Sequence, residues 1–406
     1  MTSEISGPAC AGALERLPRE ESVARNLAES SARRTTLSAP PRLVTLGTHN
    51  SCNAKCIFCL EGKYPRFDLS LYKNFFEGKM GHFIRQAEKV TFTGFGEVLW
   101  IPEVLPFLDY LNETIPETWK IFTTNGTPLR PALIERLLKS RYVIQLSLHS
   151  SRADLHAEIT QLPGAFEQIV ASLGDLCRLR RERDLGDRLH AVIVDVVTRR
   201  NVADLPALVK MAWEMKVPEL QCQYVTMFDL DHIEMSCWFE PERANAAIDA
   251  AERVLAEIKA SADPDEFAHF GVRLPRRFGR QASAPVAGGF CTDPWEMIYV
   301  EGQGPVLPCC QWGAHVGNLE KGDDLDALWN GGFYRGLRAG LASDKPHPWC
   351  AHCVNLRGYN VDSLLAHLTN RPDQQGRLLD EIARRGLADV ASYRVEVSAA
   401  DQAAPR

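Results

Sequence analysis

Three cysteines lie close together early in the chain, at Cys52, Cys56 and Cys59, with the spacing C-x3-C-x2-C. They follow a short apolar run at 43–46 that is typical of a β-strand. Cysteine thiolates hold iron–sulfur clusters, and three of them leave one iron of a cubane without a protein ligand. An open metal position can bind and activate a small molecule. Zinc loops favour C-x2-C pairs, so the three-residue gap favours an iron–sulfur cluster over a structural zinc site.

A second group of cysteines lies between residues 291 and 353 and ends in the C-x2-C pair Cys350 and Cys353. Such a pair, together with two more distant cysteines, can hold either zinc or a cubane cluster through four thiolates, and the spacing leaves both open. Cys309 and Cys310 are adjacent, and neighbouring side chains of an extended segment point in opposite directions. We therefore expect only one of these two to be a ligand.

Length and composition limit the remaining possibilities. The chain has 406 residues, of which 45% are hydrophobic, which is enough for a large core and one to three domains. Its net charge of −6 and the lack of a long basic run argue against a nucleic-acid partner. The chain has no run of about 18 apolar residues and no apolar segment of a signal peptide in residues 1–30. We expect no membrane partner, a cytoplasmic location and reduced thiols.

Apolar, β-branched runs alternate with helical patterns from Arg42 onward. Strands are expected at 43–48, 89–93, 120–124, 142–148, 190–198 and 219–227, and helices at 68–86, 102–113, 130–140, 163–182 and 203–215. Such alternation is typical of parallel βαβ units with right-handed connections. Six units are too few for an eight-stranded barrel, so the sequence predicts an α/β fold with an open, partial barrel.

The chain divides into five predicted segments. These are a poorly ordered extension at 1–41 with one helix near Glu20–Ser31, the barrel at 42–239, a helix and a linker or lid at 240–290, the cysteine-rich domain at 291–353, and a C-terminal helix near 373–390 with a tail, within 354–406. The extension is assigned from its Ala, Ser, Glu and Arg content.

The first cysteine loop resembles the C-x3-C-x-(aromatic)-C signature of the radical S-adenosylmethionine (SAM) enzymes, with Phe58 in the aromatic position. The resemblance implies a partial (β/α)6 barrel, a SAM-binding [4Fe–4S] cluster and an electron donor such as flavodoxin or ferredoxin. It also implies that SAM is cleaved reductively and that a hydrogen atom is taken from an unactivated carbon of a small-molecule substrate.

The second predicted strand ends in Gly94-Phe95-Gly96-Glu97, where this family has a Gly-Gly-Glu type of motif. The resemblance implies that Gly94 and Gly96 let the backbone approach the methionine part of SAM, and that Glu97 pairs with its ammonium group. Phe95 departs from the family pattern. A simple turn between strand and helix is the alternative.

Three further strand ends carry residues that match positions used by the family. Thr124 and Asn125 form a Thr-Asn-Gly turn with the next residue, and Ser147 stands where the family commonly has a Ser near the ribose. His149 stands where the family often has Asp, so it contacts substrate or cofactor, or it is a hydrogen-bonded structural residue. Arg199 reaches the SAM carboxylate or only caps its loop.

The second cysteine group resembles the C-terminal half of the SPASM and twitch radical SAM enzymes. The shared motifs are C-x-x-P-W from Cys291, G-x4-C ending at Cys309, Gly317-Asn318-Leu319, Leu328-Trp329-Asn330 and Cys350-Ala351-His352-Cys353. SPASM proteins carry seven cysteines here, so this shorter set resembles the twitch form with one auxiliary [4Fe–4S] cluster. The resemblance implies Cys291, Cys309, Cys350 and Cys353 as its ligands, with Cys310 as the alternative to Cys309.

Several reactions are compatible with these motifs. The first is oxidation of a secondary alcohol of a sugar, cyclitol or nucleoside-like compound in a biosynthetic pathway, as in enzymes of the 2-deoxy-scyllo-inosamine dehydrogenase type. The second is a redox-neutral epimerisation, in which Cys222 or Cys237 returns a hydrogen atom; the alternative for both thiols is a buried, small hydrophobic residue. The third is a peptide modification or maturation. A non-catalytic metal-binding scaffold is the fourth.

Overall fold

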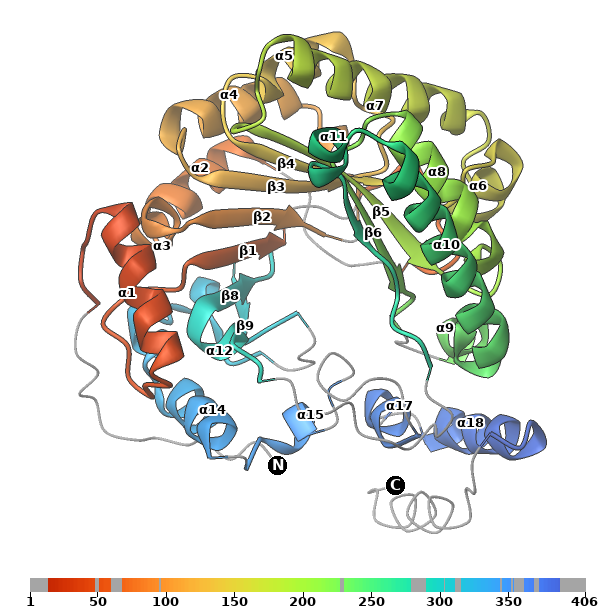
Figure 1. The fold of residues 1–406 in the computed structure, drawn as a ribbon. Helices are drawn as coiled ribbons and strands as arrows, with labels where there is room; N and C mark the ends of the chain where they lie inside the picture. Colours follow the sequence, from red (N-terminus) through yellow and green to blue (C-terminus); the bar gives the residue numbers. More distant parts are fainter. Residues whose placement is uncertain are drawn as a thin grey trace.

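The computed structural model describes residues 14–47, 51–59, 68–94, 96–226, 230–278, 290–302, 304–310, 315–343, 345–351, 353, 361–368 and 372–387. These residues form one sheet of ten strands in the order β10-β9-β8-β1-β2-β3-β4-β5-β6-β7. The sheet is curved, and α2, α4, α5, α7 and α8 lie along its outer side (Figure 1). The C-terminal helices α14, α15, α17 and α18 lie across its open side.

Seven consecutive strands of the sheet, β1 to β7, are parallel and confirm the predicted partial barrel. They are β1 (Leu43–Gly47), β2 (Lys89–Thr93), β3 (Trp119–Thr124), β4 (Tyr142–Ser147), β5 (Leu189–Val197), β6 (Glu219–Tyr224) and β7 (Gly271–Arg273). The helices between them are α2 (Leu69–Glu77), α3 (Gly81–Gln86), α4 (Val104–Thr114), α5 (Pro131–Leu137), α6 (Ala153–Thr160), α7 (Ala165–Glu182), α8 (Leu205–Glu214), α9 (Leu230–Met235), α10 (Pro241–Ser261) and α11 (Pro264–Ala268), with short 3-10 turns η1 (Val98–Trp100), η2 (Val202–Asp204) and η3 (Cys237–Phe239).

The two faces of the barrel sheet differ in chemistry because side chains alternate along each strand. The outer face is aromatic and apolar: Phe92 stacks on Phe122 with ring centroids 4.9 Å apart, and both meet Phe107 of α4. The inner face carries half-buried polar side chains such as Thr123 and Gln145, which hydrogen-bond to each other at 2.9 Å. A core therefore lies between sheet and helices, while the inner face keeps polar groups available.

The cysteine-rich domain extends the barrel sheet. Its elements are α12 (Asp293–Glu296), β8 (Met297–Val300), β9 (Pro305–Leu307), β10 (Gly317–Asn318), η4 (Leu319–Lys321), α13 (Leu325–Trp329), α14 (Gly332–Ala342) and α15 (Pro348–Ala351), followed by α17 (Val361–His367) and α18 (Pro372–Arg384). β8 pairs in parallel with β1, and β9 and β10 continue from it in antiparallel order. The domain is therefore joined to the barrel through its first strand.

The segment 240–290 differs in part from the expected helix and linker. The helix is present as α10, but residues 271–273 form β7, which pairs in parallel with β6 from Glu219 to Gln221. The apolar pattern is too short to identify this strand, because the seventh strand has only three residues. Residues 279–289 lie outside the described part of the chain.

The N-terminal segment is also different from the expectation, because residues 14–41 are folded against the C-terminal elements instead of being poorly ordered. The expected helix is present as α1 (Arg19–Ser31), and its buried face consists of polar side chains. Asn26 Nδ2, for example, donates a hydrogen bond to Trp295 O at 2.8 Å. A polar helix of this kind is typical of a solvated segment by sequence, but here it is buried by the nearby residues 38–40 and by partners more than 200 residues away.

Within the described residues, no helix has both the length and the apolar character needed to cross a lipid bilayer.

Candidate functional site

The three thiols of the first cysteine loop lie close enough to interact electrostatically. Burial, followed by the nearby thiols of Cys59 and Cys52, raises the pKa of Cys56 to about 12. Cys52 Sγ accepts hydrogen bonds from Ala54 N at 3.4 Å and from Asn125 Nδ2 at 3.8 Å. Clustered thiols with N–H donors to sulfur fit the donor set of an iron–sulfur cluster, whose binding displaces thiol protons.

Helix α6 holds the cysteine loop in place, and the sequence analysis does not predict this helix. Lys55 N donates to Thr160 O at 3.0 Å, and Ile57 N donates to Ile159 O at 2.9 Å. The last carbonyl groups of a helix have no partner inside the helix, so the loop amides satisfy them. Gln161 ends the helix in the left-handed region with φ 53°. The signal for α6 is weak because its eight residues lie between two longer predicted elements.

Glu97 joins the ends of two strands to the cysteine loop. Its carboxylate is 2% exposed and accepts hydrogen bonds from Leu99 N at 3.0 Å and Asn125 N at 2.5 Å. Its backbone N donates to Ser51 O at 2.9 Å. Burial raises the pKa of Glu97 to about 7, against the opposing effect of these backbone donors. Both carboxylate oxygens thus have protein partners, and the expected contact with the SAM ammonium stays a prediction. Gly94 and Gly96 beside it are partly exposed, and Phe95 lies outside the described residues.

We expect Glu97→Gln to lower the free energy of unfolding by about 1–3 kcal/mol, because one amide NH2 group must face a backbone N–H donor. The pKa of Glu97 in the folded chain, about 7, is above its ordinary value of 4.5. Between these two pH values the folded chain keeps a proton on Glu97 that the unfolded chain has released. The Glu97 contribution to stability therefore falls as the pH rises from about 4.5 to about 7, and the variant loses this dependence.

Urea unfolding of both proteins at the two ends of this pH range measures the effect. Glu113→Gln is the matched control, because Glu113 is exposed on α4. Equal stability of Glu97→Gln and the parent chain at both pH values would contradict the bridging role of Glu97.

The Thr-Asn-Gly turn after β3 binds the cysteine loop directly. Asn125 Nδ2 donates to Asn53 Oδ1 at 2.7 Å, and Asn125 Oδ1 accepts from Thr127 Oγ1 at 2.7 Å. Thr124 Oγ1 accepts from Gly126 N at 3.1 Å, and its hydroxyl also donates to the Glu97 carboxylate. Gly126 has φ +81°, and a side chain there would meet buried apolar groups at 3.1 Å. The turn is therefore built for loop positioning, while its contact with SAM stays a prediction.

His149 lies in a buried network behind the cysteine loop. Its side chain is 2% exposed, and its Nδ1 accepts from Val196 N at 3.2 Å and lies 3.6 Å from Asp195 Oδ1. Its ring meets Phe58 edge-on with centroids 5.0 Å apart and stacks on His156 at 6.0 Å. Because Nδ1 accepts a backbone hydrogen, neutral His149 carries its proton on Nε2. These contacts favour a structural, hydrogen-bonded role for His149, in which it positions Phe58, over direct contact with substrate or cofactor.

Arg199 and Ser147 have different surroundings. Arg199 Nη1 donates to Glu240 Oε1 at 3.2 Å and its backbone N donates to Met235 O, which directs the side chain to the start of α10. This arrangement favours a capping role over contact with the SAM carboxylate. Ser147 is the half-buried last residue of β4 and lies on the inner face of the sheet, as expected for a residue near a bound ligand.

The two candidate hydrogen-donor thiols are buried. Cys222 is 3% exposed and pairs in register with Asp195 on the face of the sheet that the helices cover, opposite to Gln221 and Gln223. Cys237 is 1% exposed in η3. Burial raises the pKa of both thiols. The register therefore does not bring Cys222 to the inner face, contrary to the expected donor position.

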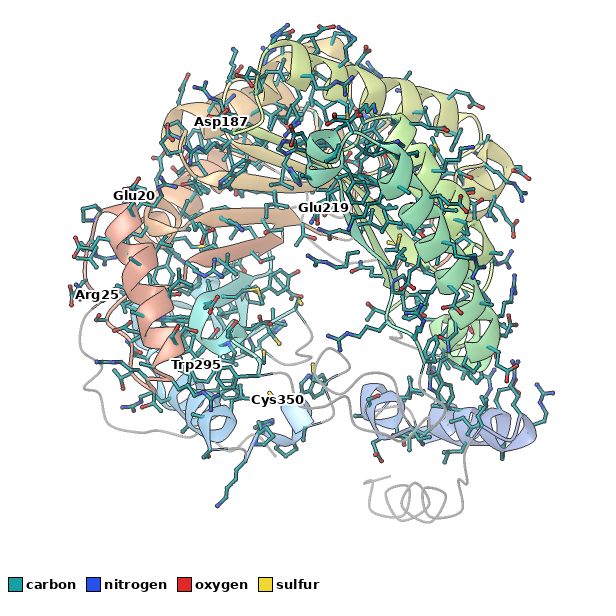
Figure 2. The ribbon with its side chains drawn as sticks, viewed as in Figure 1. Glu20, Arg25, Asp187, Glu219, Trp295 and Cys350 are labelled. Atoms are coloured by element: carbon teal, nitrogen blue, oxygen red, sulfur yellow. The ribbon has the colours of Figure 1, made fainter. Side chains whose placement is uncertain are left out.

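The second cysteine group brings three thiols into electrostatic contact. Burial, followed by Asp293 and then by Cys353 and Cys350, raises the pKa of Cys291 to about 12. Burial, Cys353 and Asp293 likewise raise the pKa of Cys350 to about 11. Figure 2 shows Cys350 on the same side of the molecule as Trp295, away from Asp187. Cysteines with these neighbours fit a shared cluster.

Cys309 and Cys310 differ in environment, as their alternation predicts. Cys309 is half-buried and contributes to the raised pKa of Tyr334, which burial mainly causes, whereas Cys310 is exposed. This difference favours Cys309 as the ligand. Among the described residues, no three His, Cys, Asp or Glu side chains already surround one point as in a finished metal site.

The motif residues around the second cysteine group bind the N-terminal segment. Trp295 Nε1 donates to Arg34 O at 2.7 Å, and Trp329 Nε1 donates to Ala39 O at 3.1 Å. Asn330 bonds both backbone groups of Leu37, accepting at 3.0 Å and donating at 2.7 Å. The C-x-x-P-W and L-W-N motifs therefore hold residues 34–39 against the cysteine-rich domain.

Comparison with known proteins finds relatives of the cysteine-rich domain and of the overall fold. Residues 291–354 match SPASM, an iron–sulfur cluster-binding domain. The structure of native anSMEcpe with bound AdoMet superimposes with a TM-score of 0.55 at 15% identity, covering 84% of this chain and 99% of that chain. The chain therefore has the fold of an AdoMet-binding protein, and its residues 291–354 resemble a SPASM domain. The relatives thus include both expected kinds of cofactor: an iron–sulfur cluster in the matched domain and AdoMet in the solved structures.

Two further relatives show how far the likeness extends. Streptococcus suis SuiB bound to S-adenosylmethionine has a TM-score of 0.54 at 16% identity, covering 79% of this chain and 72% of that chain. The AdoMet-dependent heme synthase of Methanosarcina barkeri is 21% identical over 325 residues, which are 73% of this chain and 85% of that protein. The structural likenesses show a common fold.

Proposed function

We propose that this protein is a radical SAM oxidoreductase that removes a hydrogen atom from an unactivated carbon of a small polar molecule and oxidises a secondary alcohol there. The observation that carries the proposal is the presence of two clusters of interacting cysteines. The first is Cys52, Cys56 and Cys59 on a loop at the barrel, and the second is Cys291, Cys350 and Cys353. When bound, SAM and the first cluster supply one-electron chemistry that breaks an unactivated carbon–hydrogen bond.

The residues of the chain have distinct tasks in this reaction. Cys52, Cys56 and Cys59 hold the first cluster and leave one iron open for SAM. Asn125 and the end of α6 fix the loop that carries these cysteines. Cys291, Cys309, Cys350 and Cys353 give the auxiliary cluster four thiolates, so it has no open iron and serves electron transfer.

The inner face of the barrel supports a polar substrate. Thr45, Thr123, Gln145, Ser147 and Gln221 are half-buried on this face. Hydroxyl and amide groups that are partly withdrawn from water favour a ligand with which they can form hydrogen bonds. A hydroxylated small molecule, such as a sugar or cyclitol, has such groups.

Burial of Cys222 and Cys237 supports oxidation over epimerisation. An epimerase needs a thiol that returns a hydrogen atom to the substrate carbon. Cys222 lies on the helix-covered face, and Cys237 is 1% exposed. An electron sink remains necessary, and a closed auxiliary cluster is suited to that task.

A peptide substrate is the second candidate. Another structure of SuiB holds its precursor peptide SuiA, and anSMEcpe was solved with a Cp18Cys peptide. These structures share the fold of this chain, and each likeness covers at least 78% of it.

Anaerobic incubation with SAM, a reductant and a substrate panel in deuterated water tests the proposal. The panel contains polyols, aminocyclitols, nucleosides and peptides. We expect a hydroxylated small molecule to increase 5′-deoxyadenosine release and to lose a pair of hydrogen atoms by mass spectrometry. Incorporation of solvent deuterium at an inverted carbon would contradict oxidation and indicate epimerisation. A response to peptides alone would contradict the proposed class of hydroxylated small-molecule substrates.

A further inference from the structure

Arg338 is a fully buried arginine next to the second cysteine group. It lies on α14 with 0% of its surface exposed. Its Nε donates to Pro294 O at 2.8 Å, and its Nη1 donates to Thr35 O at 3.1 Å and to Asn330 Oδ1 at 3.2 Å. Its guanidinium carbon lies 4.4 Å from the centre of the Trp329 ring.

All of these acceptors are neutral, so the charge of Arg338 has no carboxylate in contact among the described residues. Its Nη2 is buried and has no hydrogen-bond partner there. Glu29 is the acidic group that acts on it from a distance, and the Glu29 carboxylate already accepts from Ser38 N and Ala39 N. Burying a charge without an opposite charge in contact costs free energy of folding.

Arg338 still carries its charge at neutral pH. Burial lowers the pKa of Arg338 to about 9, which is above the neutral range. A negative group that binds near this buried, charged guanidinium would offset part of the cost of burying it.

The segments around Arg338 lead to two of the proposed cluster ligands. Pro294, whose carbonyl accepts from Arg338, follows Cys291 by three residues. Tyr334, one turn earlier on α14, interacts with Cys309 and with Arg338. The guanidinium therefore contacts the segment that follows Cys291, and the Tyr334 side chain that it meets also interacts with Cys309. Four thiolates make a cubane cluster negative, and one more electron makes it more so.

We propose that Arg338 is the buried counter-charge of the auxiliary cluster and raises its reduction potential. The inference rests on the proposed function, since it requires an iron–sulfur cluster in the second cysteine group. The fixed positive charge stabilises the reduced cluster, because net charge and hydrogen bonding set cluster potentials. The cluster gains one electron as the substrate radical loses one electron and one proton, and a soluble electron carrier then reoxidises it.

The potential of the auxiliary cluster is measurable on its own in the full chain that carries Cys52→Ala, Cys56→Ala and Cys59→Ala. In this background an EPR-monitored redox titration reports a single cluster. We expect Arg338→Met to lower the reduced-to-oxidised ratio at a fixed potential about tenfold, which is about 59 mV for one electron. Arg335→Met is the matched control on α14 and should leave the potential unchanged, because Arg335 is partly exposed.

Asn330→Asp is an independent probe that keeps Arg338 in place. The new carboxylate would lie where Asn330 Oδ1 now accepts from Arg338 Nη1 at 3.2 Å. Its negative charge would offset the positive charge of the guanidinium, so the reduction potential of the cluster should fall, as in Arg338→Met. This variant carries the test if Arg338→Met does not retain iron. An unchanged potential in an iron-loaded Arg338→Met or Asn330→Asp protein would overturn the inference. Absence of iron in the background chain itself would instead overturn the proposed auxiliary cluster.

Discussion

Simultaneous replacement of Cys52, Cys56 and Cys59 by alanine should abolish reductive cleavage of SAM and lower the iron content from about eight to about four per chain. The chain should still fold, because backbone bonds from Lys55 and Ile57 to α6 hold the loop independently of the thiols. Iron and sulfide analysis of anaerobically reconstituted protein, together with chromatography of 5′-deoxyadenosine, measures both effects.

Cys177→Ala is the matched control for this experiment. Cys177 is 1% exposed on α7 and lies outside both cysteine groups, so its loss should cost packing energy alone. A triple variant that still holds about eight irons and cleaves SAM would contradict the assignment of the first cluster. Stoichiometric zinc beside about four irons in the parent chain would contradict the second.

Replacement of Cys353 by alanine should remove product formation while leaving part of the SAM cleavage. An oxidation sends one electron out of the substrate, and the auxiliary cluster with an incomplete ligand set no longer accepts it. The first cluster belongs to a different loop, so its iron should remain. Product and 5′-deoxyadenosine, measured in the same sample, separate the two steps.

The neighbouring Cys310 provides the control for the auxiliary ligands. Cys310 is exposed whereas Cys309 is half-buried, so Cys309→Ala should lose iron and product, and Cys310→Ala should keep both. The reverse result would exchange the two assignments. Full product formation by Cys353→Ala would remove the auxiliary cluster from the electron path.

The barrel was predictable because its signals are local. Runs such as 89–93 and 142–147 are apolar and β-branched, they alternate with helical patterns, and parallel units follow from that order. The spacing of the first cysteine group was equally informative, since Cys52, Cys56 and Cys59 lie in one short loop. For Cys222, the alternation of Leu220 and Cys222 with Gln221 and Gln223 already indicates the helix-covered face.

The remaining features depend on contacts between distant parts of the chain. The burial of the polar face of α1 cannot be predicted locally, because Asn26 and Ser30 form hydrogen bonds with Trp295 and Glu296. In the sequence, Glu97 likewise looks like a carboxylate without a protein partner. In the structure, Asn125 N, which directly follows β3, donates a hydrogen bond to one of its oxygens. Such tertiary hydrogen bonds override the local preference of a segment, and no sequence period encodes them.

Release of 5′-deoxyadenosine from SAM by the iron-loaded parent chain is the most direct test of a radical SAM activity. The protein is reconstituted to about eight irons, reduced under anaerobic conditions and incubated with SAM, beside the chain with alanine at Cys52, Cys56 and Cys59. We expect 5′-deoxyadenosine from the parent chain alone, in an amount that rises with a hydroxylated substrate. A loaded parent chain that releases no more 5′-deoxyadenosine than the triple variant would contradict the proposed activity.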